Sequence, residues 1–533
     1  MSGAALDIGR DLSAARYELE AFLLRGDFEL SEDGRLVGTV EPGQAAAEVS
    51  FGKLLLSCWS DEWSKVWRVT AGEIEPERLI LRCTRQMGRV TCLLELRRGA
   101  APVELAKSRA GFAEDLVRLI ESNLTGIQVE HAATARDDQR HLSGTHVRLV
   151  LKDAGYAQAG VTAGIATAGV ESQAIVDATL GAGIAWLDAL RGSRSLVRGL
   201  MIFLPAGHSA TVATRVTMLR AGDPAVSLYE VSEEDKTITP VTPFDQGDLA
   251  DNLRRAAARA IWPREKGFAG AASDLLDDVV RLAPDLIDAR QMGSAIILSI
   301  RGLEFARVLV KQRRVVFGLE NDKRTLKDQN RAHLARLVND IGLLRTTLSD
   351  DRNGLIYRAQ SERWLESAVR REATVIEPNI DPRFVYSQVP TYRGEQRTFI
   401  DLLGITRAGR LVIMELKVAE DPDFPLQALD YWLRVDWHRR RGDFQRRGYF
   451  RGVEIADAAP LLYLVAPLFR FHATTSLLGG SISERVPVYR IGINEDWRSG
   501  IRVLLRERLN AASGLNESRS GSFTRNPTLS PNA

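Results

Sequence analysis

The run from Ile400 to Lys417 constrains the fold of this chain more than any other segment. It reads 400-IDLLGITRAGRLVIMELK-417, two apolar stretches separated by the glycine-containing turn 407-RAG-409. Such an arrangement is typical of an antiparallel hairpin. In a hairpin, Asp401 at the start of the first strand lies beside the end of the second. Because side chains alternate along a strand, Glu415 and Lys417 point to the same face at that end.

This arrangement predicts two acids and a lysine at one end of an apolar sheet, a grouping that phosphodiester hydrolysis uses. The carboxylates of Asp401 and Glu415 are hard oxygen ligands for Mg²⁺ or Mn²⁺. A bound cation lowers the pKa of a water molecule and neutralises charge on the phosphate. Lys417 would orient that water or help to deprotonate it. The segment therefore predicts a metal-dependent nuclease site.

A Glu-x-Lys tripeptide is a weak signal by itself, and its context makes this one specific. A second match, Glu234-Asp235-Lys236, lies in a polar run with no apolar strand before it. Lys417 is the single lysine between residues 328 and 533, in a chain with 10 lysines and 61 arginines. The alternative is a surface Glu/Lys pair that closes a hairpin.

The C-terminal region resembles the PD-(D/E)xK nuclease superfamily and is most similar to the catalytic domain of NucS/EndoMS-type endonucleases. The resemblance is carried by 362-ERWLESAVR-370, 400-IDLLGITRAGRLVIMELK-417, 426-LQALDYWLRV-435 and 461-LLYLVAP-467. It implies a restriction-endonuclease-like mixed sheet and an Mg²⁺- or Mn²⁺-dependent endodeoxyribonuclease, acting in DNA repair or defence. By motif position it implies a catalytic set of Glu362, Asp401, Glu415, Lys417 and Gln427, with Asp401 and Glu415 as metal ligands.

Two members of this set could equally have a purely structural role. Glu362 follows Ser361 and could be a first-turn acid favoured by the helix dipole, with Glu366 one turn later as the alternative site acid. Gln427 could be an exposed helix residue. The acidic loop 420-EDPD-423 departs from the family and should repel phosphate unless it turns outward or binds metal.

A basic and aromatic segment follows, 434-RVDWHRRRGDFQRRGYFR-451. Cations bind phosphates and aromatic rings stack on unpaired bases, so the segment predicts a nucleic-acid surface. Its predicted DNA-binding residues are Arg439, Arg440, Arg441, Arg446 and Arg447. The alternative is a solvated helix end whose aromatic residues, Trp437, Phe444, Tyr449 and Phe450, lie in the core.

The remaining chain predicts a mixed α+β, multidomain protein, as its length of 533 residues requires. We expect a β-rich domain at 1–125, a polar connection at 126–145 and an α/β domain at 145–240. A helical and hairpin connection at 241–350, with helices around 248–261 and 272–288, should lead to the nuclease-like domain at 355–510 and a disordered tail at 511–533. The order of elements at 155–232 repeats that at 398–493. However, 161-VTAGIATAGV-170 contains no acid or lysine, so we interpret 145–240 as a degenerate copy of the nuclease-like fold. The alternative is that any α/β domain shows this order of elements.

Composition limits the partners and the compartment. A net charge of +2 argues against a histone-like binder. Cys58, Cys83 and Cys92 form no metal-binding pair and predict buried free thiols. The first residues lack the apolar segment of a signal peptide, and no apolar run could span a bilayer. We expect a cytoplasmic protein that binds DNA and has no membrane partner. The sequence does not determine the oligomeric state, and it is compatible with a homodimer. The competing function is a non-catalytic nucleic-acid-binding or scaffold protein on nuclease-like folds.

Overall fold

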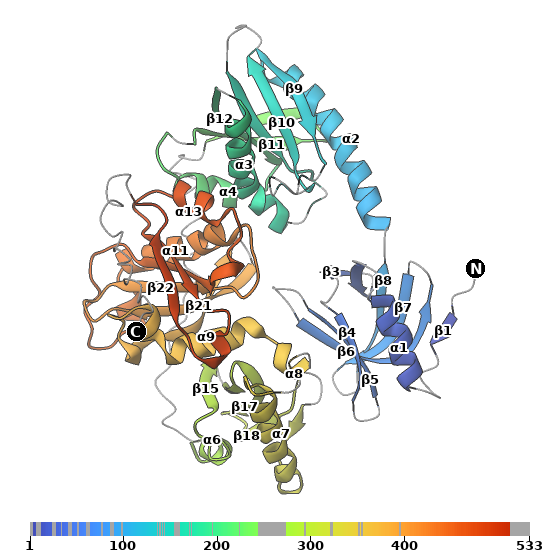
Figure 1. Cartoon of the computed structure of the whole chain (residues 1–533), viewed down its shortest axis with the longest axis vertical. Coiled ribbons are helices and arrows are strands. Elements are labelled where there is room, and N and C mark those ends of the chain that lie inside the picture. Colours follow the sequence, from blue (N-terminus) through green and yellow to red (C-terminus); the bar gives the residue numbers. More distant parts are fainter. Residues whose placement is uncertain are drawn as a thin grey trace, which may run out of the picture.

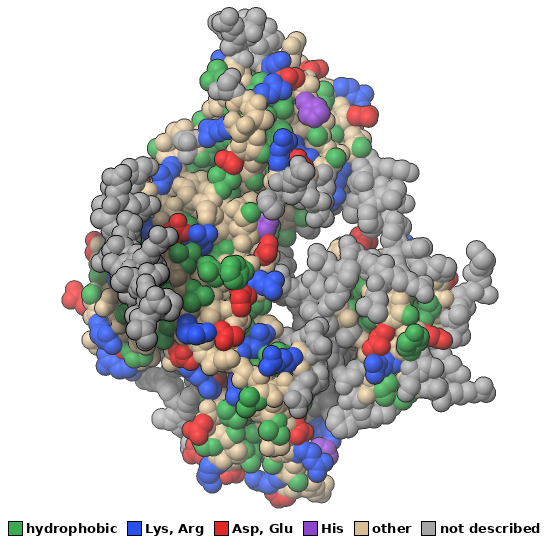
Figure 2. All heavy atoms as spheres, in the orientation of Figure 1, with side chains coloured by type: hydrophobic (Ala, Val, Ile, Leu, Met, Phe, Trp, Pro, Cys, Tyr) green, Lys and Arg blue, Asp and Glu red, His purple; other side chains and the backbone are tan. Residues whose placement is uncertain are grey.

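The computed structural model describes residues 4–511 except for internal segments, of which 243–272 is the longest and 154–159 the next. The protein is mixed α+β and multidomain, as the sequence predicts. Four sheets follow one another along the chain (Figure 1), with eight, six, five and six strands. Lys/Arg and Asp/Glu side chains intermix over the face drawn in Figure 2, in keeping with the near-neutral net charge.

The N-terminal domain is an antiparallel sheet. Its elements are β1 (Ala4–Leu6), α1 (Leu12–Leu23), β2 (Phe28–Glu32), β3 (Arg35–Val40), β4 (Ala45–Ser50), β5 (Lys53–Trp59), β6 (Ser64–Ile74), β7 (Arg78–Arg85) and β8 (Val90–Arg97). Alternate residues of the strands bury one face, which packs on α1 around Trp67. The three cysteines are free and buried in this domain, which confirms that prediction. The long helix α2 (Ala100–Asn123) leads away to the second sheet (Figure 1).

The second and fourth sheets have the same strand order and the same pattern of pairing. The second contains β9 (Ile127–Ala133), β10 (Val147–Asp153), β11 (Val161–Ala166), α3 (Gln173–Ser193), β12 (Val197–Pro205), α4 (Ala210–Val216), β13 (Val226–Ser232) and β14 (Thr237–Val241). The fourth contains α9 (Ser361–Arg371), β20 (Tyr386–Arg393), β21 (Gln396–Ile405), β22 (Leu411–Leu416), α11 (Phe424–Arg440), β23 (Leu461–Pro467), α13 (Thr475–Ser481), β24 (Val488–Ile493) and β25 (Val503–Arg508). In each sheet the three central strands pair in parallel and the outer pairings are antiparallel.

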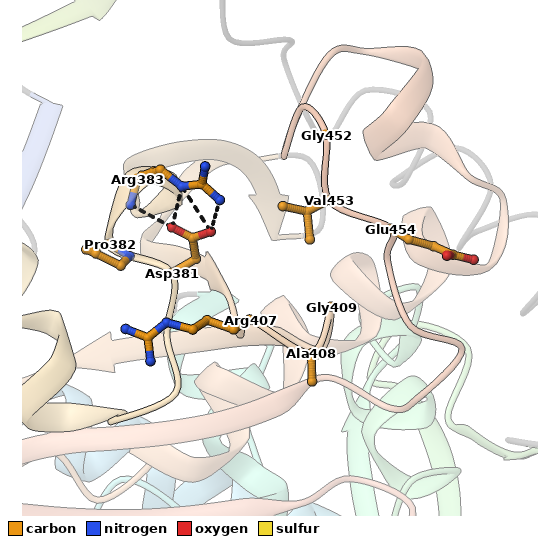
Figure 3. A pocket seen from close by; sticks show the side chains of 9 residues that line it. All are labelled: Asp381, Pro382, Arg383, Arg407, Ala408, Gly409, Gly452, Val453 and Glu454. Carbon is orange, nitrogen blue, oxygen red and sulfur yellow. Dashed lines mark hydrogen bonds and ion pairs between the residues drawn. The ribbon is translucent and has the colours of Figure 1, made fainter.

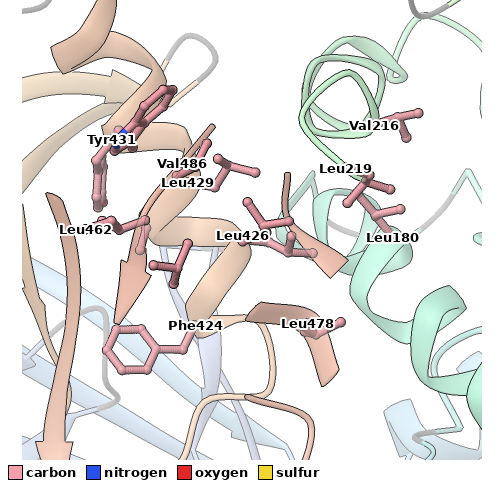
Figure 4. Close-up of a cluster of buried hydrophobic side chains, with 14 of the residues drawn as sticks. Leu180, Val216, Leu219, Phe424, Leu426, Leu429, Tyr431, Leu462, Leu478 and Val486 are labelled. Carbon is pink, nitrogen blue, oxygen red and sulfur yellow. The ribbon is translucent and has the colours of Figure 1, made fainter. Parts of the chain in front are cut away.

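Helices cover both faces of each of these sheets, in corresponding places. Helix α2 packs on one face of the second sheet through Phe112 and Leu116, as α9 packs on the fourth through Trp364 and Leu365. The opposite faces, covered by α3 and α11, meet in one shared core that joins the two domains (Figure 4). The repeated order of elements is therefore present in the structure, with the same strand pairing in both sheets.

The contact between the two copies is reciprocal. Helix α3 contacts α13, and its counterpart α11 contacts α4, the counterpart of α13. Between them Leu219 pairs with Ile482 in an antiparallel bridge. Arg220 N donates to Ser481 O at 2.9 Å and Ser483 N donates to Met218 O at 2.8 Å. Such an exchange of equivalent bonds is what an approximate two-fold axis through the bridge produces.

The third sheet lies between the two copies in sequence but forms a domain of its own. It comprises α6 (Ser273–Val280), β15 (Ile287–Met292), β16 (Ala295–Ile300), β17 (Leu303–Leu309), β18 (Arg314–Phe317), β19 (Arg324–Thr325) and α7 (Arg331–Leu344). It has a separate hydrophobic core around Leu298, Phe305 and Ile341. The expected connection at 241–350 is therefore a packed domain over its described residues. Asp288 of β15 binds Ser367 at 2.7 Å and Arg370 at 2.8 Å, which fixes this domain against α9.

Several expected boundaries differ from the observed ones. Strand β9 occupies part of the polar segment 126–145 that we expected to be a connection, because an edge strand needs only one apolar face. The helix expected at 272–288 ends at Val280, before β15 begins. The helix expected at 248–261 and the tail after residue 511 lie outside the described residues. No helix among the described residues is long and apolar enough to cross a membrane.

Candidate active site

Strands β21 and β22 bring Asp401 to the end of β22, as the hairpin geometry predicts. Leu402 pairs with Met414 and Ile405 with Leu411, so Asp401 is opposite Glu415. The Oδ2 atom of Asp401 accepts a hydrogen bond from the backbone N of Leu416 at 3.0 Å. Beyond Glu415 the chain continues its parallel pairing, and Lys417 N donates to Val465 O of β23 at 3.0 Å. All three residues of the predicted motif therefore meet at the carboxyl end of β22.

The carboxyl group of Glu415 is buried in a negative environment. The residue is 6% exposed, and its Oε2 atom has no hydrogen-bond partner. Burial raises its pKa well above the ordinary value, and the carboxylates of Asp401 and Glu362 raise it further, whereas Lys417 lowers it. Burial likewise raises the pKa of Asp401, which Arg363 opposes. Two desolvated carboxyl groups this close favour either protonation or a bound cation.

Lys417 is held among these acids. Its pKa is raised because the attraction of Glu362, Asp421, Glu415 and Asp401 together outweighs the desolvation that lowers it. Its Nζ lies 3.2 Å from Asp421 Oδ2, and its side chain is 12% exposed. The lysine is therefore charged and enclosed, and it is not a freely solvated surface cation.

Both candidate helix acids face this group from α9. Glu362 acts electrostatically on Glu415 and on Lys417. Glu366 is 7% exposed, and burial raises its pKa to about 7, with Arg363 opposing and Asp401 adding to the shift. Its Oε2 accepts from Arg363 Nη1 at 2.9 Å. The sequence offered these two acids as alternatives, whereas the structure brings both to the same set of charges.

Gln388 links Glu366 to Asp401, a role that the sequence did not indicate. Its Nε2 donates to Glu366 Oε2 at 2.6 Å and to Asp401 Oδ1 at 3.1 Å. It is a non-glycine residue with a φ of 52°, at a break in the pairing of β20 with β21. The pairing on either side of this break keeps one register, so Gln388 stays opposite Asp401. No pattern in the sequence marks the positive φ that accompanies the break.

On α11, Tyr431 is the residue whose pKa is shifted by the acids of the site. Gln427 is half-buried and its backbone N donates to Asp423 O at 3.0 Å. One turn later, burial and the carboxylates of Glu415 and Asp401 raise the pKa of Tyr431. Because residues at i and i+4 share a helix face, the spacing from Gln427 could have identified Tyr431 from the sequence. The role of Gln427 stays a prediction.

The carboxylate oxygens at this site suit a hard cation, but two carboxylates do not complete its coordination. Glu415 offers a buried oxygen with no partner, beside the carboxyl of Asp401. Both oxygens of Asp401 accept hydrogen bonds from nitrogen. In the described part of the chain, no group of three or more His, Cys, Asp or Glu side chains is arranged to hold a metal ion. A cation at this position would have two protein carboxylates and would take its other ligands from water, as Mg²⁺ commonly does.

Two of the three acids in the loop 420–423 have protein partners. Asp421 pairs with Lys417, and Asp423 Oδ2 lies 3.2 Å from Arg215 Nη1 of the second domain. Asp423 is 6% exposed. Two of the loop's three acids are therefore held by protein cations that they share with other carboxylates, and Glu420 is exposed.

The predicted nucleic-acid surface is only partly as expected. Phe444, Tyr449 and Phe450 are between 0% and 4% exposed, so the prediction that they stack on bases is wrong. They pack against one another in the core, with Phe444 edge-on to Tyr449 and the other two ring pairs tilted. Arg439 has an 8% exposed side chain and pairs with Asp436 and Asp457. Three other arginines are exposed and stay candidates for phosphate contact, at side-chain exposures of 69% for Arg440, 54% for Arg441 and 62% for Arg446.

The second copy lacks these groups at the corresponding positions. Thr167 N donates to Phe203 O at 3.1 Å, which is the counterpart of the bond from Lys417 to Val465. Thr167 therefore stands where Lys417 does. By the same register Ile165 takes the place of Glu415, and its partner Arg148 takes that of Asp401. The second domain keeps the fold and has no acidic pair at this position.

A separate open cavity of about 750 Å³ lies at the other end of the β21–β22 hairpin, beside its turn. It is lined by Asp381, Pro382, Arg383, Arg407, Ala408, Gly409, Gly452, Val453 and Glu454 (Figure 3). The carboxylate of Asp381 is engaged by Arg383, whose Nη2 lies at 2.6 Å and whose backbone N lies at 3.1 Å. The charged side chains that line this cavity are of both signs, and none of them belongs to the group around Asp401.

Comparison with known proteins identifies no family for this chain. No protein-family model matches it, and no curated protein matches it. Among solved structures it is weakly similar to the crystal structure of protein VC1899 from Vibrio cholerae, with 13% identity over 55% of this chain and 72% of that one. The TM-score of 0.14 is too low to support an argument about fold or function.

Proposed function

We propose that the C-terminal domain is a metal-dependent nuclease of the PD-(D/E)xK type that hydrolyses phosphodiester bonds of DNA. One observation carries the proposal: Asp401, Glu415 and Lys417 meet at the end of β22, with Glu415 buried, Asp401 half-buried and the pKa values of both acids raised. Perturbed acids grouped with a fixed cation are typical of catalytic sites. A purely structural Glu/Lys pair would have no reason to bury an unpartnered carboxyl oxygen, which costs stability.

In this proposal Asp401 and Glu415 hold Mg²⁺ or Mn²⁺, which when bound would activate a water molecule and neutralise charge on the scissile phosphate. Lys417 orients the attacking water and donates to the phosphate oxygens, whose charge grows in the transition state. Gln388 fixes the orientation of Asp401 and Glu366 through its two hydrogen bonds. The bonds to Leu416 N and Gln388 leave Asp401 with one fixed orientation, which reduces the reorganisation needed for reaction.

A second candidate is a non-catalytic nucleic-acid-binding protein on nuclease-like folds. The specific observation in its favour is the second domain, which keeps the fold with Arg148, Ile165 and Thr167 at the corresponding positions. The absence of a three-ligand group among the described side chains also favours it.

A cleavage assay in Mg²⁺ and in Mn²⁺, on single-stranded, duplex and branched DNA, separates the two candidates. The nuclease proposal expects metal-dependent products that Asp401→Asn and Glu415→Gln abolish. Calorimetric titration with Mn²⁺ gives a second measurement, in which both variants should lose binding. A protein that binds DNA and Mn²⁺ without cleaving any substrate would support the second candidate.

A further inference from the structure

A continuous series of contacts runs from the candidate catalytic lysine to the second domain. Lys417 Nζ lies 3.2 Å from Asp421 Oδ2. The other oxygen of Asp421, Oδ1, accepts from the backbone N of Asp423 at 2.9 Å. Asp423 Oδ2 in turn lies 3.2 Å from Arg215 Nη1, on α4 of the second domain. Every step is a direct hydrogen bond or ion pair.

Arg215 is fixed from several sides. It is 0% exposed. Its Nε and Nη2 donate to the two oxygens of Asp430 on α11, at 3.1 and 2.9 Å, and its Nη1 also donates to the carbonyl of Asp177 at 2.7 Å. A bidentate arginine–carboxylate pair defines both distance and direction. Arg215 therefore holds the first turns of α11 and the loop before it in one place.

The packing around Asp423 is close. A methyl group at Gly181 of α3 would lie 3.0 Å from Asp423 Oδ1, so the glycine allows α3 to approach the loop. Leu426 and Leu478 surround the same position. The second domain thus supplies both the cation and the surface against which the loop is placed.

We propose that Arg215 is a positioning residue for Lys417, and that the second domain serves the C-terminal site through it. Resting on the proposed nuclease function, the inference is that Arg215 holds Asp423, the Asp423 backbone holds Asp421, and Asp421 fixes the ammonium group. A domain with no acidic pair of its own would then complete the site of its counterpart.

The test is a double-mutant cycle on the full chain with Arg215→Lys and Asp421→Asn. Lysine keeps the positive charge at position 215 but cannot form the bidentate pair with Asp430. Each change should lower the rate of cleavage at saturating DNA by roughly 10–100-fold, the range for residues that orient a catalytic group. The affinity for DNA should not change. Because both act through one series of contacts, the double variant should be no slower than the slower single variant. Asp457→Asn, which breaks the Arg439–Asp457 pair elsewhere in the domain, is the matched control.

The ¹⁵N chemical shift of the Lys417 Nζ, assigned by its loss in Lys417→Arg, gives a readout that needs no activity. It should move in both variants and stay in place in Asp457→Asn. Unchanged rates and shifts, or effects that multiply in the double variant, would overturn the role of Arg215. If Arg215→Lys does not fold, Asp423→Asn closes the same cycle. If the wild-type protein cleaves nothing, the nuclease proposal fails, and the shift alone then decides whether Arg215 positions Lys417.

Discussion

The Nζ of Lys417 lies 3.2 Å from the Oδ2 of Asp421, four residues along the chain. This pair turns the lysine into a fixed, enclosed cation whose side chain is only 12% exposed. A lysine in that state contributes little to the attraction of a polyanion at long range. It is instead suited to contact one group at one position, as a catalytic donor does.

The first prediction follows from that pair. Lys417→Ala should reduce metal-dependent cleavage by ~10²–10⁴-fold, because no other group can replace a positioned donor in the transition state. DNA affinity should change little, since one enclosed cation is lost among many arginines. Lys417→Arg should also fail, because guanidinium is broad and stays protonated. Lys323→Ala, which removes the lysine paired with Glu304, is the control that should cleave normally.

The second prediction concerns pH and Glu366. Burial raises the pKa of this residue from 4.5 to about 7 in the folded protein. The folded state therefore binds the proton more tightly, and its contribution to stability is complete below pH 4.5 and lost as the pH rises through 7. Glu366→Gln should remove this component, which is on the order of 1–3 kcal/mol.

Urea unfolding of wild type and Glu366→Gln between pH 4 and 8 measures the difference. The free energy of unfolding should fall less steeply with pH in the variant, and the two curves should separate most between pH 4.5 and 7. Glutamine can still accept from Gln388 through its carbonyl oxygen, so folding should persist. Curves that stay parallel across this range would show that Glu366 is ionised in the folded protein.

The sequence predicted those parts of the site whose geometry is determined by local rules. Alternation along β22 and the short turn at 407–409 were enough to place Asp401, Glu415 and Lys417 together, because register in a hairpin is set by its turn. The fold of the second copy was also visible, since β11, α3 and β12 carry strong apolar patterns. Its missing acids were readable directly from 161–170.

What the sequence could not provide depends on contacts between distant segments. Arg215 is 208 residues from Asp423 along the chain, and nothing near either residue indicates the pair. Gln388 contacts both Asp401 and Glu366 from a strand position with a φ of 52°, where one pair of the β20–β21 ladder is missing. The aromatic residues at 444–450 have the same spacing whether they face solvent or the core, so their burial followed from tertiary packing alone.

The third prediction separates exposed arginines from a buried one. Arg440, Arg441 and Arg446 have exposed side chains, whereas Arg439 is enclosed between Asp436 and Asp457. If the exposed three contact phosphates, their joint replacement by alanine should reduce the slope of log affinity against log salt by ~0.9 for each contact. Arg439→Ala should leave that slope unchanged and lower the unfolding temperature. Binding titrations at several salt concentrations measure it, and a slope unaffected by the triple change would remove this surface from the DNA interface.

The last prediction tests whether the third domain supports the site through α9, using two glycines with nearly the same backbone. Gly302, with a φ of +80°, lies so close to α9 that an added methyl group would overlap the carbonyl group of Arg363. Gly207 has a φ of +79° and nothing within 4 Å of that position. Gly207→Ala should cost only the strain of a left-handed alanine, roughly 1 kcal/mol. Gly302→Ala adds the clash with backbone and should cost several times more, or displace α9 together with Glu362 and Glu366. Chemical denaturation gives both costs, and the cleavage rate reports the displacement. Equal costs and equal rates for the two variants would show that the third domain does not hold α9 in place.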